Sequence, residues 1–501
     1  MIFSIKKVDV FSQQTDVLVA PVFKNESLLS SDLRVLDRLL EGKLSELFDE
    51  KTLTGKDNEV VVIHGFGELK AKRLLLVGLG ERSALTCEKL RKAAGEIVRR
   101  AKGAKAKKVV WLWDIGTLDA ADTTQAVAEG AVMGGYTFDC YKTKPEKNEK
   151  PTKIKEIVLA VPDSEHISAM ESAVITGLVI GESVNIARDL ANMPPNDLTP
   201  SAFVDLAKKY LDGQKSIMID VIDKKKAKAL GMHAFLGVGQ GTVEPCYMMA
   251  VSYHPMKNKK PIGLVGKGVT FDTGGISIKP SKGMEEMKGD MSGAAAVLGT
   301  VIALSKLKVQ TNVLAVMPLS ENMPSGSAQR PGDIVAAMNG KTIEITNTDA
   351  EGRLILADAL CYAVTKGCSQ LVDIATLTGA CLVALGDQAA AILGSDQGMI
   401  DTFLKVGERT GERLWQLPLY EEYFDYIKSD SADMVNSSEN RLAGTAVGAI
   451  FLKQFVGDTP WVHLDIASMM HYSKVSGYTV KGMSGVGVRT LVGYCRQQSG
   501  L

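Results

Sequence analysis

The order of predicted strands and helices limits the fold of this chain more than any other feature. Through the first third, short apolar runs alternate with amphipathic stretches of helical period. Strands that alternate with helices are typical of a layered α/β architecture. The predicted strands are 17–23, 59–64, 73–77, 108–113 and 155–161, and the predicted helices between them are 88–102 and 124–133.

A long helical pattern over 168–190 separates this first region from a second one. It ends at Pro194 and Pro195, because proline lacks the amide hydrogen that a helix interior needs. The segment 141–155 is rich in Lys, Glu and Pro, and predicts an exposed loop or boundary. Beyond the prolines, the predicted strands are 217–222, 247–253, 262–265, 312–317, 342–346, 371–375 and 461–464, and the predicted helices are 293–307, 354–365 and 446–455.

A chain of 501 residues is too long for a single hydrophobic core. We therefore predict two α/β domains, each a mixed sheet flanked by helices. The N-terminal domain is expected at 1–165, a linking helix at 166–195 and the C-terminal domain at 196–501.

Charge and cysteine content argue against several classes of protein. Lys+Arg and Asp+Glu are both 58, and a net charge of zero does not indicate a general nucleic-acid surface. Polar residues from Asp9 onward interrupt the start of the chain, and no apolar run reaches the ~18 residues of a membrane span. The seven cysteines are scattered without a C-x-x-C pair, which is typical of reduced thiols. We expect a cytoplasmic protein with neither a signal peptide nor a membrane partner.

A glycine-rich segment after the predicted strand 262–265 holds the first candidate site residues, Lys267 and Asp272. Glycines there let the backbone turn sharply and approach a ligand closely. Lys279 follows, and Asp290 stands just before the next predicted helix. The order of these residues along the chain places charged side chains where a predicted strand ends and a predicted helix begins.

A second polar segment, Asn-Thr-Asp-Ala-Glu-Gly-Arg-Leu at 347–354, lies between a predicted strand and a predicted helix, where α/β proteins place ligands. Grouped carboxylates would repel one another and stay partly protonated unless cations neutralise them. Two divalent ions would resolve that repulsion, as in two-metal hydrolases. A network of ion pairs also accounts for the spacing. The carboxylates are Asp272, Asp290, Asp349 and Glu351, and the cations are Lys267, Lys279 and Arg353.

These segments resemble the leucyl aminopeptidase (cytosol aminopeptidase) family. Its signature octapeptide stands unbroken at 347–354, and the pattern K-G-x-x-x-D-x-G-G stands at 267–275. The resemblance covers roughly 180–495, whereas the N-terminal region matches only in general pattern. An unbroken signature with correctly spaced partners is a specific signal. The further matching elements are Lys279-Pro280, Met287-Lys288-x-Asp290-Met291, Glu321-Asn322-Met323 and Arg330-Pro331-Gly332-Asp333.

The resemblance implies a metal-dependent aminopeptidase with a dinuclear site in its C-terminal domain. Asp272 and Glu351 would bridge two divalent ions, Mn²⁺ or Zn²⁺. Lys267 and Asp290 would complete one site, and Asp349 would complete the other by side chain and main-chain oxygen. As a ligand Lys267 must be neutral, so its pKa must fall far below about 10.4, which an adjacent dication makes plausible. The alternative for Lys267 is a salt bridge to one of the acids.

The same resemblance assigns catalysis to Lys279 and Arg353. Lys279 would polarise the scissile carbonyl and stabilise the oxyanion of the tetrahedral intermediate. Arg353 would hold a bicarbonate ion as general base, since a guanidinium binds a planar oxyanion bidentately. The metals would activate the attacking water and hold the free amine of a peptide substrate, which explains cleavage at N-termini only.

The substrate pocket is expected, by analogy, to favour leucine and other apolar residues. A methionine-lined pocket fits such side chains, although plain core packing is the alternative for each pocket residue. The pocket residues would be Met287, Thr376, Gly379 and Ala467. The chain departs from the family pattern at Thr273, at Ser468 and within 481–485, which bears on pocket shape.

The resemblance also implies a homohexamer, and it raises DNA binding as a second role because some family members bind DNA. The cations within 89–108 form either a DNA-binding patch or a solvated helix face, which the salt dependence of DNA affinity would separate. The complete polar set argues against a catalytically inactive homologue. Neither H-E-x-x-H nor G-x-S-x-G occurs in the sequence, so other hydrolase mechanisms lack their motifs.

Overall fold

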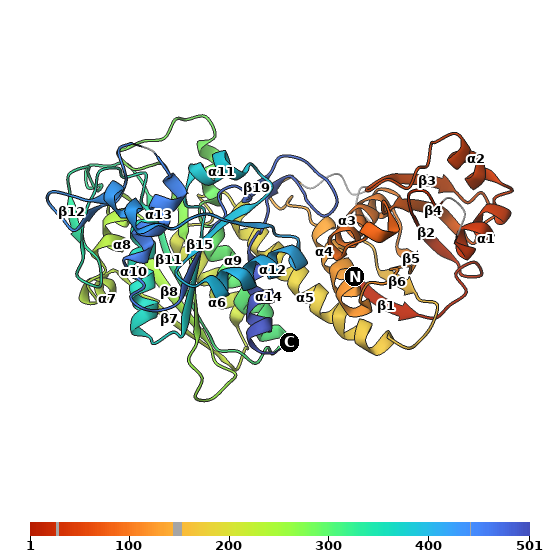
Figure 1. The fold of residues 1–501 in the computed structure, drawn as a ribbon, viewed down its shortest axis with the longest axis horizontal. Helices are drawn as coiled ribbons and strands as arrows, with labels where there is room; N and C mark the ends of the chain where they lie inside the picture. The colour runs from red at the N-terminus through yellow and green to blue at the C-terminus, as the bar shows by residue number, and fades with distance from the viewer. Residues whose placement is uncertain (27–29, 144–152, 441, 501) are drawn as a thin grey trace. The chain divides into compact units, whose positions relative to one another are not determined.

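The computed structural model describes residues 1–26, 30–143, 153–440 and 442–500 (Figure 1). Most of the predicted loop at 141–155 lies outside the described residues. The chain forms two compact units, Met1–Glu182 with Ser473–Lys481 and Ser183–Tyr472 with Gly482–Leu501. The division after Glu182 falls inside helix α5, Ile167–Asn192. The domain limits near 165 and 195 stay a prediction.

The N-terminal unit is a six-stranded mixed sheet between helices. Its order is β1-β6-β5-β2-β4-β3, with β3 antiparallel to β4 and the other neighbours parallel. The five predicted strands and two predicted helices are present, whereas β1 was not predicted. The elements are β1 Ile2–Lys6, β2 Thr15–Val22, β3 Val60–His64, β4 Ala71–Gly78, β5 Lys108–Leu112, β6 Glu156–Ala160, α1 Ser31–Leu39, α2 Lys43–Asp49, η1 Arg82–Ala84, α3 Cys87–Gly103 and α4 Ala120–Gly134.

Strand β2 shows why this sheet needs a nearly continuous apolar sequence. Successive side chains of a strand point to opposite faces of the sheet. Val17 and Val19 pack in one core with α3 and α4, whereas Leu18 and Ala20 pack in another with α1 and α2. Both faces of the strand are therefore buried, as in parallel sheets that helices cover on two sides.

The C-terminal unit is built on a nine-stranded mixed sheet. Its order is β16-β15-β18-β14-β9-β11-β8-β7, and β10 pairs with β11 beyond the end of β9. Strands β18, β14, β9 and β11 are mutually parallel, so their carboxyl ends lie along one edge. The strands of this sheet are β7 Ile217–Ile222, β8 Tyr247–Tyr253, β9 Ile262–Gly266, β10 Gly268–Asp272, β11 Val313–Asn322, β14 Gln370–Ala375, β15 Ala390–Gly394, β16 Leu414–Gln416 and β18 Trp461–Asp465.

Helices cover both faces of the C-terminal sheet (Figure 1). Val265 packs in one core with α10, while the next residue, Gly266, faces the backbone of α9 at Gly293. The predicted α/β fold with two mixed sheets is thus confirmed. The helices are α6 Pro200–Leu211, α7 Lys224–Ala229, α8 His233–Val238, η2 Gly239–Gly241, η3 Met284–Gly289, α9 Ser292–Lys306, α10 Gly352–Thr365, α11 Gly379–Leu385, α12 Gln397–Thr410, η4 Glu421–Ile427, α13 Gly444–Lys453 and α14 Val488–Gln498. Two small sheets contain β12 Ile334–Ala336, β13 Thr342–Glu344 and β17 Met434–Val435, and β19 His471–Tyr472 with β20 Gly482–Met483.

Helix α5 is the one helix of the described residues that is long and apolar enough to cross a membrane, with a mean hydropathy of 1.4. Core helices of soluble proteins have the same length and composition. Met170 and Val174 at its start are buried in the N-terminal core, and Val184 and Leu190 near its end are also buried. This burial favours a core helix.

The start of α9 lies so close to the sheet that only glycine fits there. A Cβ on Gly293 would lie 2.2 Å from the carbonyl oxygen of Ile374 and 2.8 Å from the backbone nitrogen of Lys267. We expect Gly293→Ala to lower the free energy of unfolding by about 1–3 kcal/mol, because the backbone must move apart. Urea denaturation measures this change. Gly326→Ala is the matched control, since no atom lies within 4 Å of its Cβ position, and an equal loss there would contradict the steric explanation.

Candidate active site

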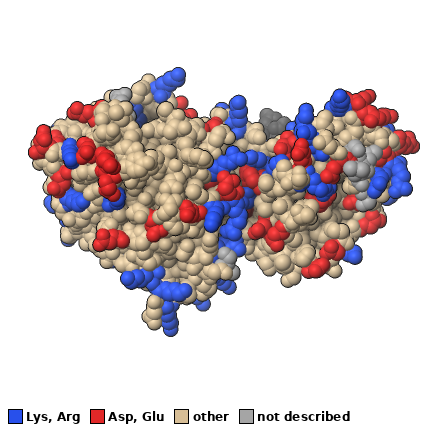
Figure 2. Space-filling model, viewed as in Figure 1, with Lys and Arg blue, Asp and Glu red and all other residues tan. Residues whose placement is uncertain are grey.

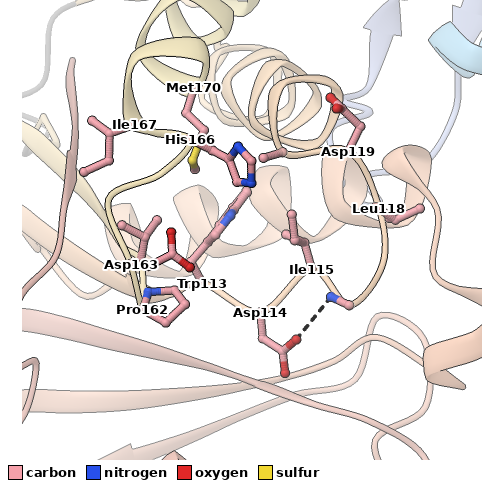
Figure 3. A pocket seen from close by; sticks show the side chains of 13 residues that line it. Trp113, Asp114, Ile115, Leu118, Asp119, Pro162, Asp163, His166, Ile167 and Met170 are labelled. Carbon is pink, nitrogen blue, oxygen red and sulfur yellow. Dashed lines mark hydrogen bonds between the residues drawn. The ribbon is translucent and has the colours of Figure 1, made fainter.

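A cavity of about 440 Å³ in the N-terminal unit lies where β5 and β6 end (Figure 3). Its acidic residues already have local partners. Asp114 is held by Arg82 at 2.7 Å, and Asp119 and Asp163 accept backbone N–H groups that follow them in the chain. Within the described residues, the group of acidic side chains that converges on one point lies elsewhere, in the C-terminal unit.

A cavity of about 620 Å³ lies at the carboxyl edge of the C-terminal sheet. All site residues predicted from the sequence line it, although their separate roles stay a proposal. The sequence positions span more than two hundred residues, and the parallel strands bring them together. The residues are Lys267, Asp272, Lys279, Met287, Asp290, Asp349, Glu351, Arg353, Thr376, Gly379 and Ala467.

Strand ends and helix starts present the charged side chains. Lys267 lies at the break between β9 and β10, which pair in turn with β11. Asp272 ends β10 opposite Asn322, the last residue of β11. Asp290 comes just before α9, and Glu351 just before α10. Each group therefore lies at or next to the end of a strand or helix.

The glycine of the octapeptide has a steric role at this site. A Cβ on Gly352 would lie 2.5 Å from Cε and 2.8 Å from Nζ of Lys267. Real Cβ atoms essentially never approach other atoms so closely, so any larger residue would push the lysine aside. The glycine of the motif thus leaves room for the Lys267 side chain at the start of α10.

Lys267 is buried among groups that accept its hydrogens. Its Nζ lies 2.7 Å from Asp290 and 2.9 Å from Glu351. It also donates to the main-chain oxygen of Thr376 at 3.0 Å, while the Thr376 hydroxyl donates to Asp290 at 2.7 Å. The segment after β14 is therefore tied to the charged cluster.

Lys279 contacts the other two carboxylates of the cluster, Asp272 and Asp349. Its Nζ lies 2.8 Å from Asp272 and also contacts Asp349. The second oxygen of Asp272 accepts the side-chain amide of Asn322 at 2.8 Å and the backbone N–H of Gly274 at 2.9 Å. These contacts fix the direction of the Asp272 carboxylate toward the cluster.

Burial changes the proton affinities of the cluster. It raises the pKa of Glu351 to about 8, and the nearby charge of Asp272 adds to the effect. Burial likewise raises the pKa of Asp290 to about 6. Burial alone would lower the pKa of Lys267, but attraction to Asp290 and Glu351 outweighs it, and the pKa lies above its usual range. Because the pKa values of Glu351 and Asp290 are raised, a bound cation would compete with protons for these two carboxyls.

The carboxylates fit a divalent metal ion. Oxygens of Asp272, Asp290 and Glu351 lie within 4.8 Å of one another. Oε2 of Glu351 is buried and has no hydrogen-bond partner among the described residues. A buried oxygen without a partner costs free energy, and coordination of a hard cation would satisfy it.

Arg353 reaches the cavity from the first turn of α10. One terminal nitrogen donates to the main-chain oxygen of Asn436 at 2.9 Å, while Nε is buried without a partner in the described part of the chain. Burial lowers the pKa of Arg353 to about 10, so the side chain stays charged at neutral pH. A charged donor that lacks a partner fits a small oxyanion.

Thr273 and Ser468, two of the departures from the family pattern, are both buried. Thr273 donates its hydroxyl to the main-chain oxygen of Asn322 at 2.8 Å, and Ser468 donates to that of Ala389 at 2.7 Å. Neither residue is among the described residues that line the cavity.

Two asparagines support the site without having been assigned a role from the sequence. Asn322 stands in a matching motif, and its side chain bonds Asp272 and the main-chain oxygen of Thr348. Asn436 accepts the backbone N–H of Thr346 and donates to the main-chain oxygen of Asn347. No local pattern marks Asn436, because it is far from the octapeptide in sequence.

Comparison with known families confirms the resemblance. The model of the cytosol aminopeptidase family, catalytic domain, matches residues 185–492, and that of its N-terminal domain matches residues 19–145. A probable cytosol aminopeptidase of Geobacter sp. (strain M21) is 44% identical over 489 residues, 97% of each chain. One of Alkaliphilus oremlandii (strain OhILAs) is 42% identical over 481 residues, 95% of each chain.

Solved structures agree with this result. The bottromycin maturation enzyme BotP in complex with Mn is 34% identical, with a TM-score of 0.85 over 97% of this chain and 100% of that chain. A mutant of tomato leucine aminopeptidase is 32% identical, with a TM-score of 0.89 over 99% of this chain and 96% of that chain. With both domain models matched in order and this identity over nearly its whole length, the protein belongs to the cytosol aminopeptidase family of metal-dependent exopeptidases.

Proposed function

We propose that the protein removes leucine and other apolar residues from the free N-termini of peptides, using two divalent metal ions and bicarbonate. The observation that carries this proposal is the convergence of three buried carboxylates beside Lys279 and Arg353 in one cavity. The family accounts for the aminopeptidase activity, and the cavity lining supports the preference for apolar residues.

The carboxylates and Lys267 would hold the metals. Asp272 and Glu351 would bridge them, Lys267 and Asp290 would complete one site, and Asp349 would complete the other. When bound, Mn²⁺ or Zn²⁺ ions supply Lewis-acid polarisation of the scissile carbonyl and lower the pKa of a water molecule. To act as a ligand, Lys267 must release the proton that ties it to its two carboxylate neighbours.

Lys279 and Arg353 would act on the substrate side. Lys279 would donate a hydrogen bond to the carbonyl oxygen as negative charge develops on it. Arg353, whose Nε has no partner among the described residues, would orient a bicarbonate ion that supplies a general base. Both cations lie in the same cavity as the carboxylates.

The cavity lining favours an apolar N-terminal residue. Met284, Met287, Leu377, Ala467 and Met470 line it, and methionine side chains adapt to aliphatic groups. The free amine of a peptide would be held at the metals that the acidic cluster binds, and an internal peptide bond offers no such group. The same cavity thus supports both exopeptidase action and preference for leucine.

Hydrolysis of leucine p-nitroanilide tests this proposal. Activity should be lost on chelation and should return when Mn²⁺ or Zn²⁺ is added. Acetylation of a peptide's N-terminus should stop its cleavage, because the nitrogen is then an amide and has no free lone pair for a metal. Efficient cleavage of the acetylated peptide would contradict amine recognition, and inactivity with every metal would reject the proposal.

The raised pKa values predict a pH dependence of metal binding. Glu351 and Asp290, with ordinary pKa values of 4.5 and 3.8, keep protons in the folded protein up to about 8 and about 6. The stability that these protons contribute is present below pH 4 and is lost as pH rises through 6 to 8. Metal ions compete with the same protons, so the increase in Tm caused by Mn²⁺ should be larger at pH 8 than at pH 6. Differential scanning fluorimetry measures it, and an equal increase at both pH values would argue against these carboxyls as ligands.

DNA binding receives less support from the charges. Arg91 pairs with Glu129, and both Arg99 and Arg100 pair with Glu96. Figure 2 shows side chains of both signs intermingled on the visible face of the N-terminal unit. Paired charges do not form the continuous basic surface that DNA binding requires. The homohexamer and the cytoplasmic location remain proposals, and sedimentation velocity would test the assembly.

A further inference from the structure

Asp465, the last residue of β18, is fully buried and holds the two segments that form one wall of the cavity. Its Oδ1 accepts the backbone N–H groups of Leu377 at 3.1 Å, Ala467 at 3.2 Å and Thr378 at 3.4 Å. Its Oδ2 accepts the hydroxyl of Thr378 at 2.6 Å. Strands β14 and β18 are parallel neighbours, with Ala375 opposite Asp465, so both segments leave the sheet beside this carboxylate.

The same carboxylate is linked to α13 through one hydroxyl. An ionised carboxylate only accepts hydrogen bonds, so Thr378 donates its single hydroxyl hydrogen to Asp465. The Thr378 hydroxyl lies 2.8 Å from that of Thr445 in the first turn of α13, and must therefore accept from it. Gly444 and Val447 of α13 also line the cavity. Hydrogen bonds that begin at Asp465 thus connect β18, the turn at Thr378 and helix α13.

Asp465 is not among the described residues that line the cavity, whereas Leu377, Thr378, Gly379 and Ala467 are. It therefore acts on a substrate indirectly, through the segments that it holds and through the effect of its charge on Arg353. The turn 377–379 begins directly after Thr376, whose carbonyl and hydroxyl contact the charged cluster.

We infer that Asp465 is a positioning residue that fixes the wall of the substrate pocket and so sets the preference for an apolar N-terminal side chain. The inference rests on the proposed aminopeptidase function of this cavity. Without the carboxylate, buried N–H groups of the turn lose their acceptor, and the turn must move to find another. A leucine side chain of the substrate would then lose the surface against which it packs. An N-terminal glycine has no side chain that packs there, so its binding would change less.

Three variants separate this role from a general loss of stability. Asp465→Ala removes every contact, while Asp465→Asn keeps an oxygen for the N–H groups and places an N–H₂ donor beside Thr378. Asp373→Asn is the matched control. Asp373 is equally buried on adjacent β14, but it bonds the side chains of Trp461 and His463 instead of the turn.

The readouts are kcat and KM for leucine and glycine p-nitroanilides, and hydrogen–deuterium exchange of the segment 376–380 in the metal-loaded enzyme. For Asp465→Ala we expect the leucine-to-glycine ratio of kcat/KM to fall about tenfold, mainly through KM for leucine, because charged hydrogen bonds are lost. Exchange of the segment should accelerate. Asp465→Asn should recover most of both properties, and Asp373→Asn should change neither. An unchanged ratio and exchange in Asp465→Ala would overturn the inference, as would equal changes in the control.

Failure of the proposed function is recognised separately. The wild-type protein would then hydrolyse neither substrate with any metal, whereas hydrogen exchange would still decide whether Asp465 holds the turn. If Asp465→Ala does not fold, Thr378→Val removes the Thr378 hydroxyl, and with it the contacts to Asp465, to Thr445 and to the backbone N–H of Cys381. That variant should lower the leucine-to-glycine ratio of kcat/KM by a smaller factor. An unchanged ratio would overturn the inference.

Discussion

Replacing Glu351 with alanine is expected to abolish peptide hydrolysis while the protein stays folded. The side chain is 2% exposed, lies 2.9 Å from Lys267 and belongs to the cluster whose oxygens converge within 4.8 Å. Loss of the proposed bridging ligand should lower the bound metal below two ions per chain. It should also remove several kcal/mol of transition-state stabilisation, a rate loss of about a thousandfold. Elemental analysis and the rate on leucine p-nitroanilide measure both effects.

Folding should survive this change because burial already raises the pKa of Glu351. A carboxyl whose charged form is disfavoured contributes little stability near neutral pH. Glu351→Gln, which keeps the volume, should lose activity to a similar extent. Glu286→Ala is the control, since Glu286 is exposed on the same cavity outside the cluster. A full complement of metal in Glu351→Ala would show that Glu351 is not a bridging ligand.

Lys279→Ala is expected to lower kcat by roughly 10²–10³-fold with a much smaller change in KM. The reason is that the proposed contact of Lys279 with the carbonyl oxygen would strengthen only as negative charge develops in the transition state. Its Nζ lies at the acidic cluster, 2.8 Å from Asp272. Steady-state kinetics measure kcat and KM separately. The metal is kept at a saturating concentration so that metal loading does not limit the rate.

Lys282→Ala is the matched control for this variant. Lys282 is an exposed lysine on the same cavity, so its removal tests the effect of one less positive charge nearby. We expect kcat to change little, because an exposed charge is screened by water and salt. If Lys279→Ala raised KM alone, the proposed oxyanion role of Lys279 would be wrong.

Many of the strands followed from local patterns. The predicted strands 217–222 and 247–253 coincide with β7 and β8. Strand β10, Gly268–Asp272, was instead interpreted as a glycine-rich segment, because glycine disfavours strands. It forms a strand because β11 extends to Asn322 and offers a pairing edge beyond the end of β9. Pairing partners of this kind do not appear in local periodicity.

For the candidate site too, local patterns revealed some features and missed others. Motif spacing identified Lys267, Asp290 and Glu351, but it did not show that both carboxylates lie against the same ammonium group. Asn436, which bonds Arg353 through its main-chain oxygen, carried no signal at all. Asp465 also stood outside every assigned role, because its contacts are with a turn on a neighbouring strand.

The sequence by itself determined the family and the kinds of chemical groups available, since residue type sets charge, ligand preference and hydrogen-bonding capacity. The tertiary structure decided which of these groups meet, how deeply they are buried and which backbone segments hold them. The physical reason is that such contacts join residues brought together by strand order and helix packing. Burial in that assembled site then raises the pKa of Glu351, which no property of the isolated residue predicts.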